Sequence, residues 1–290
     1  MFTQYFGNYL LNKGYLTAEQ LHDALEEIKD ARLKLGVLAV NAGYMTAEQT
    51  EEVNEAQKKY DKRFGELAIE MGYLTEEQLK ELLSSQKYGH LLLSQVLVDK
   101  GIMTLSEFEK AINQYKRDYS ISDKEFEAIQ SDDVNEIINK FIKFEGSKNE
   151  KLLKDYIALF ARNLIRFIDR DAVIKEVSKL EVYDCQFAAK QDISGAIVLT
   201  TYIEADENAF IQFASKYAEE ELSSVDEMAE ASVGEFLNLH NGIFLVNLSN
   251  QGIELKMTPQ EVFKDIKVEK LFKVSAELSF GCVNILIQEH

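Results

Sequence analysis

The stretch that decides the fold of the second half of the chain is Val225–Pro259, VDEMAEASVGEFLNLHNGIFLVNLSNQGIELKMTP. Its apolar residues recur at helical spacing as far as His240, which predicts a helix over 225–240 that stops at Gly242. Apolar runs at 243–248 and 253–257 then predict two short strands. The only proline of the chain, Pro259, comes directly after them.

Two polar residues, Glu235 and Asn238, stand three positions apart on this predicted helix. At about 100° per residue they lie about 60° apart, on a flank away from the apolar side. Ala231 and Gly234 lie beside the pair and would let the backbone of a partner approach. An ordinary solvated pair explains the same spacing. The predicted core side consists of Val225, Ala229, Ser232, Val233, Phe236 and His240.

The rest of the second half alternates between helical and strand patterns. A helix is predicted at 152–168, strands at 181–189 and 196–203 around a polar turn at 190–195, a helix at 206–222, and closing strands at 272–280 and 281–288. These elements predict an α+β fold, with an antiparallel sheet and helices packed on one face. Cys185 and Cys282 fall in predicted strands and are expected to be reduced core residues.

The first part of the chain is a repeat. Four glycines, Gly14, Gly43, Gly72 and Gly101, are spaced 29 residues apart, and similar phrases follow them: GYLTAEQL, GYMTAEQT, GYLTEEQL and GIMTLSEF. Each glycine is expected to end a short helix, and each following threonine to cap a longer one, with Gln or Glu three positions on completing a capping box. The repeat predicts an all-α domain of helical hairpins, a stack or bundle of about eight helices.

We expect two domains: 1–118 for the four repeats and 149–290 for the α+β domain, with 119–148 between them. The intervening segment has helical patterns after Ser122 and from Val134, which predict a helical connector. It could equally belong to one of its neighbours.

Composition excludes several classes of function. The net charge of −18 opposes binding to nucleic acid or to an anionic membrane. No apolar run approaches the length of about 20 residues that spans a bilayer, so no membrane insertion is expected. Four scattered histidines and two distant cysteines argue against a zinc site, and we predict no metal site. The start of the chain lacks the basic-then-apolar pattern of a secretory leader, which favours a cytoplasmic location.

The repeat resembles the N-terminal domain of type II secretion and pilus-extension ATPases, the MshEN family, whose motif is RLGxxLxxxGxxxxxxLxxxLxxQ. The segment Arg63–Gln86, RFGELAIEMGYLTEEQLKELLSSQ, is the best match, with Phe64 and Ala68 at leucine positions. The other three copies keep the spacing of the motif but differ from it at key residues.

Paired motifs of that family can bind cyclic di-GMP, so the resemblance implies this nucleotide as a candidate ligand. The second and third repeats form the best pair, because Lys34 and Arg63 occupy the arginine position of the motif. The implied binding residues are Lys34, Gly36, Gly43, Arg63, Gly65 and Gly72. The alternative is a protein-interaction or dimerisation module in which glycines and leucines serve hairpin packing alone.

The second half resembles the CheC/CheX/FliY family of chemotaxis phosphatases, whose signature is (Asp/Ser)-x-x-x-Glu-x-x-Asn with a proline some twenty-odd residues further on. Glu235, Asn238 and Pro259 match it, and Ala231 stands at the Asp/Ser position. The earlier helix offers Asn163 without the acid, so a single motif per chain is similar to CheX rather than CheC.

The resemblance implies a phosphatase that hydrolyses the aspartyl-phosphate of a CheY-like response regulator, with Glu235 and Asn238 as its catalytic residues. Asn238 would orient the attacking water and Glu235 would pair with a lysine of the receiver domain, which itself supplies Mg²⁺. We expect no cofactor bound by the chain itself. We also expect a homodimer that forms through the C-terminal domain. The alternatives are a non-catalytic adaptor and a cyclic di-GMP effector in chemotaxis or motility signalling.

Overall fold

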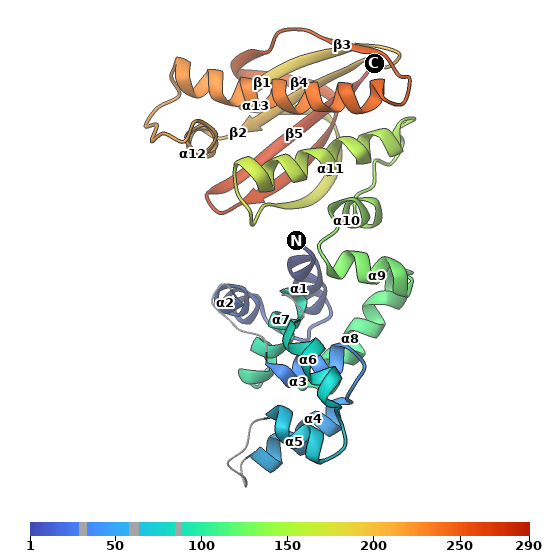
Figure 1. The fold of residues 1–290 in the computed structure, drawn as a ribbon. Coiled ribbons are helices and arrows are strands. Elements are labelled where there is room, and N and C mark those ends of the chain that lie inside the picture. Colours follow the sequence, from blue (N-terminus) through green and yellow to red (C-terminus); the bar gives the residue numbers. More distant parts are fainter. Residues whose placement is uncertain (29–33, 58–63, 85–88) are drawn as a thin grey trace. The chain divides into compact units, whose positions relative to one another are not determined.

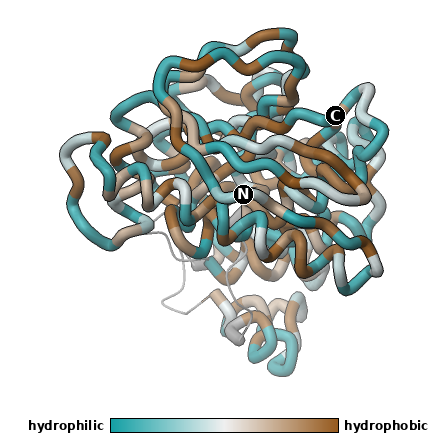
Figure 2. Tube along the Cα trace, turned by 90° about the horizontal axis from the view of Figure 1, so that it is seen from above, coloured by the Kyte–Doolittle hydropathy of each residue, from teal (hydrophilic) through white to brown (hydrophobic). Residues whose placement is uncertain are grey.

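The computed structural model describes residues 1–28, 34–57, 64–84 and 89–290, and it divides into two compact units, 2–133 and 134–290 (Figure 1). Each unit has its own hydrophobic core. Along both units the hydropathy changes from residue to residue, as in amphipathic helices and strands (Figure 2).

The first unit is all-α over its described residues. Its helices are α1 (Phe2–Asn12), α2 (Ala18–Ile28), α3 (Leu35–Asn41), α4 (Ala47–Gln57), α5 (Phe64–Glu70), α6 (Glu76–Ser84), α7 (Gly89–Asp99), α8 (Leu105–Asp118) and α9 (Asp123–Gln130). The first eight form the four helical hairpins that the repeat predicts, because each 29-residue copy contributes two helices.

The hairpin turns use the predicted chemistry. Gly14, Gly43, Gly72 and Gly101 all have positive φ, between +66° and +76°, which an L side chain rarely adopts. At the fourth turn the Thr104 hydroxyl accepts from the Glu107 backbone N–H at 3.2 Å, and the Glu107 carboxylate accepts from the Thr104 backbone N–H at 2.7 Å. The other three turns carry the same reciprocal pair, with Gln in place of Glu. The predicted capping boxes are confirmed.

A cluster of aromatic rings joins the first helix of this unit to its last ones. Phe2 and Phe6 of α1 meet Tyr115 of α8 edge-on, with ring centroids 5.9 Å and 5.2 Å apart. Phe2 also meets Phe126 of α9 at 5.7 Å. The Tyr9 hydroxyl donates to the Asp118 carboxylate at 2.9 Å, across 109 residues of sequence. The hairpins therefore do not form an open row, because α1 packs against α8 and α9.

The second unit is α+β. Its helices are α10 (Val134–Phe141), α11 (Glu150–Phe167), α12 (Glu207–Ala218) and α13 (Glu227–Ser249), and its strands are β1 (Val173–Gly195), β2 (Leu199–Ala205), β3 (Leu255–Met257), β4 (Glu261–Leu278) and β5 (Gly281–Glu289). Every strand pairing is antiparallel. The predicted combination of helices with an antiparallel sheet is confirmed.

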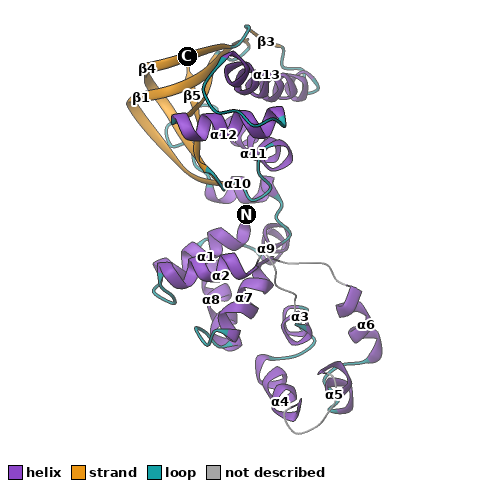
Figure 3. Cartoon of the chain, turned by 90° about the vertical axis from the view of Figure 1, so that its left-hand side faces the viewer, coloured by secondary structure: helices purple, strands orange, loops and turns teal. Residues whose placement is uncertain are grey.

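The strands close into a ring. β1 pairs with β4 over a long register from Val173↔Glu277 to Lys190↔Glu261, β4 pairs with β5, β5 with β2, and β2 returns to β1. The short strand β3 pairs with the end of β1. Helices α11, α12 and α13 lie on one side of the strands (Figure 3).

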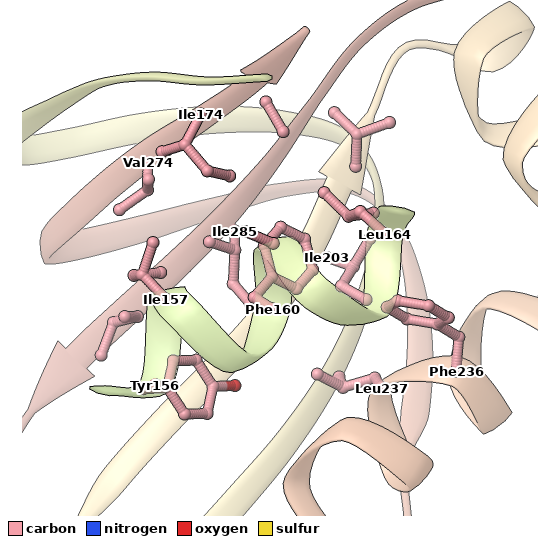
Figure 4. Packing of buried hydrophobic residues seen from close by; sticks show 14 of the residues in the cluster. Tyr156, Ile157, Phe160, Leu164, Ile174, Ile203, Phe236, Leu237, Val274 and Ile285 are labelled. Atoms are coloured by element: carbon pink, nitrogen blue, oxygen red, sulfur yellow. The ribbon is translucent and has the colours of Figure 1, made fainter. Parts of the chain in front are cut away.

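Two apolar clusters use the two sides of the strands. Toward the helices, Ile203, Val274 and Ile285 pack with Phe160 of α11 and Phe236 of α13 in the main core (Figure 4). Tyr202 and Leu286 are next in sequence to Ile203 and Ile285, and so point to the other face of their strands. They join Cys185, Val268 and Leu271 in the second cluster. Alternation along each strand thus separates a helix-facing side from a second buried side.

Three expectations for this unit are wrong. Residues 243–248 are not a strand: α13 runs through Gly242 to Ser249. The polar stretch 190–195 is not a turn, because β1 continues to Gly195 and the chain reverses after it. Cys185 is buried as expected, but Cys282 is exposed, because it lies next to the turn at Gly281 on the opposite strand face from Val283.

Candidate functional site

The helix that carries the predicted pair begins at a well-formed cap. The Asp226 carboxylate accepts from the backbone N–H groups of Met228 and Ala229 at 3.1 and 3.0 Å, which satisfies two of the amides that a helix start leaves unpaired. The apolar side then packs into the core, with Ala229, Val233, Phe236 and His240 buried as predicted. Val225 and Ser232 are only partly buried.

Glu235 and Asn238 lie on the opposite flank of α13. Glu235 is exposed and Asn238 is half-buried, and Ala231, one turn before Glu235, is exposed. The half-buried ring of Tyr217, from α12, packs edge-on against Phe236 at 5.5 Å. Burial raises the pKa of Tyr217, and the negative charge of Glu235 raises it further, so this phenol stays neutral at physiological pH. The surface around Glu235 thus combines a free carboxylate with a neutral hydroxyl.

The segment that follows β3 lies across the same part of α13. A Cβ at Gly234 would stand 2.9 Å from Cγ of Gln260, so the glycine allows the two to approach. Thr258 is anchored to β1 on both sides, since its backbone N–H donates to the Asp192 carbonyl at 3.0 Å and its hydroxyl accepts from the Asp192 backbone N–H at 3.2 Å. Pro259 stands between Thr258 and Gln260 in the sequence. The expectation that Gly234 would let the backbone of a partner approach is wrong, because Gln260 packs against this glycine.

A side chain of β1 connects Asn238 to this segment. Nε2 of Gln191 donates to Oδ1 of Asn238 at 2.9 Å and to the carbonyl oxygen of Thr258 at 2.7 Å. One side chain of β1 therefore joins Asn238 to the segment that precedes Pro259, although the two are twenty residues apart in sequence. Gln191 is only 1% exposed, and nothing in its local sequence indicates this role.

The connection continues into the interior. Oε1 of Gln191 accepts from Nδ2 of Asn241 at 2.8 Å, which also donates to the Thr201 hydroxyl at 3.0 Å. The Tyr156 hydroxyl donates to Oδ1 of Asn241 at 2.7 Å. Burial raises the pKa of Tyr156, which keeps the phenol protonated as a donor. Sequence analysis missed this network, although Asn241 and Asn238 are three positions apart on one helix.

His240 and Asn163 belong to the core rather than to the surface. His240 is fully buried, and burial lowers its pKa to about 3, so the imidazole is neutral. Its Nδ1 lies 3.2 Å from Nδ2 of Asn163, which is 5% exposed. Asn163 therefore presents no second surface site on α11.

The residues implied for nucleotide binding lie in the first unit. Lys34 and Gly36 line a cavity of about 640 Å³ together with Glu51, Asp99 and Glu107. Nζ of Lys34 forms an ion pair with Asp99 at 2.6 Å, so its charge is already balanced by a neighbouring acid.

The other implied nucleotide residues serve helix packing or turns wherever the structure describes them. A Cβ at Gly36 would stand 2.7 Å from Thr50, and one at Gly65 would stand 2.8 Å from Leu79. Gly43 and Gly72 end their helices with positive φ. Arg63 lies outside the described residues. Cyclic di-GMP binding stays a prediction.

Two general features bear on function. None of the described helices is both long enough and apolar enough to cross a bilayer. Across the described ranges, no three His, Cys, Asp or Glu side chains are grouped as a metal site would require.

Comparison with known proteins finds similarity only among solved structures. No protein-family model matches the chain, and no curated protein matches it. A CheC-like superfamily protein from Shewanella sp. PV-4 has 17% identity and a TM-score of 0.43, with 48% of this chain and 97% of that chain covered. The chemotaxis protein CheX from Vibrio vulnificus has 15% identity and a TM-score of 0.43, covering 48% and 99%. A chain of the CheX–CheY–BeF3–Mg complex from Borrelia burgdorferi has 16% identity and a TM-score of 0.39, covering 48% and 97%.

Proposed function

We propose that the 134–290 unit is a phosphatase for the aspartyl-phosphate of a CheY-like receiver domain, and that Glu235 and Asn238 carry the activity. The proposal starts from the signature Glu-x-x-Asn with a distant proline. One observation of the structure supports it above all: Gln191 donates to both Asn238 and the carbonyl oxygen of Thr258, the residue before Pro259.

The two side chains suit different tasks. Asn238 offers a neutral carboxamide, which can hydrogen-bond water without changing its charge. Only part of it is buried, so one edge faces solvent. Glu235 is exposed and carries a negative charge that can pair with a lysine of the receiver and set the register of docking. In this proposal the receiver contributes Mg²⁺ and the lysine, and the phosphatase contributes position.

The reaction is an in-line hydrolysis. The oxygen of a water forms a bond to phosphorus while the bond from phosphorus to the aspartyl carboxyl oxygen breaks. The electron pair of that bond stays on the aspartate, and the proton lost by the water goes to a phosphate oxygen. The products are the free carboxylate and inorganic phosphate. Asn238 would hold the water in line with the breaking bond.

The test is phosphate release from a chemotaxis receiver domain phosphorylated with acetyl phosphate, measured with and without the full chain. Asn238→Ala should lower kcat at least about a hundredfold while binding and folding are kept, as a misplaced water costs that much. Asn247→Ala, an exposed asparagine of the same helix, is the matched control and should keep full activity. Turnover by Asn238→Ala at the wild-type rate would refute the assignment.

Docking is tested separately. Glu235→Lys should abolish binding of the receiver, measured by calorimetry with a beryllofluoride-treated receiver. Glu269→Lys makes the same change of charge at an exposed position of β4 and serves as the control. Equal binding by both variants would show that Glu235 does not make the contact.

A non-catalytic adaptor is the second candidate, and one observation favours it. Ala231 is exposed one turn before Glu235 and offers no polar group where the family signature has Asp or Ser. Binding of the receiver without any acceleration of phosphate release by the wild-type chain would select the adaptor.

A further inference from the structure

Gln191 is a buried polar residue that is hydrogen-bonded to Asn238, one of the two proposed catalytic residues. It lies on β1 opposite Thr201 of β2, with 1% of its surface exposed. Its side chain points toward α13, as the bonds to Asn238 and Asn241 show. A buried carboxamide of this kind costs stability unless its donors and acceptors are all satisfied.

The hydrogen-bond partners fix which end of the Gln191 carboxamide is the amino group. The Thr258 carbonyl oxygen, 2.7 Å away, can only accept, so the atom facing it must be Nε2. The two protons of Nε2 are then used, one on Thr258 and one on Oδ1 of Asn238 at 2.9 Å. Oε1 faces the interior as an acceptor.

The interior end confirms the same direction. The Thr201 hydroxyl donates to the backbone carbonyl oxygen of Gln191 at 3.2 Å. The lone pairs of the hydroxyl oxygen are then left to accept from Nδ2 of Asn241. The same Nδ2 donates to Oε1 of Gln191, and Oδ1 of Asn241 accepts from Tyr156. Two backbone carbonyls, of Thr258 and Gln191, therefore set the orientation of the whole network.

The orientation of the Gln191 carboxamide determines which polar group of Asn238 faces a partner. With Oδ1 held by Gln191, the free edge of the carboxamide carries Nδ2, which no group in the described part of the chain accepts from. The two orientations of an asparagine amide have nearly the same shape, so only polar contacts choose between them. A flipped Asn238 would turn Nδ2 toward Nε2 of Gln191, donor against donor.

We propose that Gln191 is a positioning residue, which holds Asn238 with its amino group toward the receiver so that Asn238 acts on the attacking water as a hydrogen-bond donor. The inference rests on the proposed phosphatase function. It assigns to the buried network a role in the chemistry, through Asn238, beyond its contribution to stability.

The orientation is tested on the wild-type full chain without any partner, by hydrogen exchange of the side-chain amide protons in ¹⁵N-resolved NMR spectra. We expect the Gln191 amide protons to exchange more than about tenfold more slowly than those of Asn238, because two acceptors engage them away from solvent. Protected Asn238 protons with unprotected Gln191 protons would overturn the inference, whatever the activity of the protein.

The consequence is tested by turnover of the phosphorylated receiver. Gln191→Glu keeps the size and the acceptor toward Asn241 but cannot donate to Asn238, and as a carboxylate it draws Nδ2 inward. We expect kcat to fall about tenfold to a hundredfold with KM changed less than about twofold, since misplacement affects the transition state rather than docking.

Asn284→Asp is the matched control, a buried amide-to-acid change on β5 away from α13. It should lower the thermal stability of the unit without changing kcat per folded molecule. Loss of kcat in both variants alike would show a merely structural effect and overturn the positioning role. Turnover by the wild type with no loss in Gln191→Glu would overturn it too, while no turnover by the wild type would refute the proposed function itself.

Discussion

Removing one buried hydroxyl measures how strongly the network beneath α13 is held. In Tyr156→Phe the ring stays packed edge-on against Phe244, 4.9 Å away, and only the donor to Asn241 is lost. Both partners are fully buried, so Oδ1 of Asn241 keeps no donor from this side. The lost bond and the unsatisfied acceptor together cost about 1–3 kcal/mol.

Thermal unfolding followed by circular dichroism gives the measurement. For a unit of this size about 1 kcal/mol corresponds to about 2–4 °C, so we expect the Tm of the 134–290 transition to fall by roughly 2–12 °C. Tyr217→Phe is the matched control, because the half-buried Tyr217 has no hydrogen bond within the described residues, and its Tm should change by less than about 2 °C. A Tyr156→Phe variant as stable as this control would refute the reasoning.

Three further predictions concern other parts of the chain. Thr104→Ala removes a capping box and should lower the free energy of unfolding of the 2–133 unit by about 1 kcal/mol in urea denaturation, whereas an unchanged midpoint would contradict the role of the cap. Burial raises the pKa of Glu204 in the folded protein, so this residue destabilises the fold above that pKa, and the effect disappears below the pKa of the unfolded state. Glu204→Gln should therefore raise the Tm at pH 7 and leave it unchanged near pH 4. A rise in Tm that does not depend on pH would count against this prediction. Ellman's reagent should label the exposed Cys282 in the native protein and spare Cys185, whose pKa burial raises to about 12; equal labelling rates would contradict this difference.

Much of the first unit could be predicted because its information is local. Each turn contains its own glycine and its own capping pair, for example Gly101 with Thr104 and Glu107, so no distant contact is needed to place the helix ends. The packing of α1 against α8 and α9 could not be predicted in this way. It depends on rings more than a hundred residues apart, such as Phe2 and Tyr115.

The extension of α13 shows where local patterns mislead. The run 243–248 follows a glycine and is rich in apolar residues, as a buried strand would be. In the structure Leu237, Phe244 and Leu248 share one buried side at helical spacing, with Asn241 between them. Burial of this side outweighs the cost of about 1 kcal/mol for a glycine within a helix. Tertiary packing decided the element.

The candidate site was predictable only at its surface. Helical geometry places Glu235 and Asn238 on one flank from spacing alone. Gln191 comes 47 positions before Asn238, and its role depends on the register of β1 with β2 and on the path of the segment around Pro259. Neither can be read from a short stretch of sequence, because both follow from pairings between distant strands.

The closure of the first unit by aromatic rings has a consequence for the order in which it forms. During synthesis α1 precedes α8 and α9, so the ring partners of Phe2 and Phe6 in these helices are made about a hundred residues later. Contacts of such long sequence separation form late and slowly, whereas each hairpin can form as soon as its own residues are exposed. The contacts of α1 with α8 and α9 therefore form later than the contacts within each hairpin. Until α9 is complete, Phe2 and Phe6 lack these ring partners and can meet chaperones or another nascent chain instead.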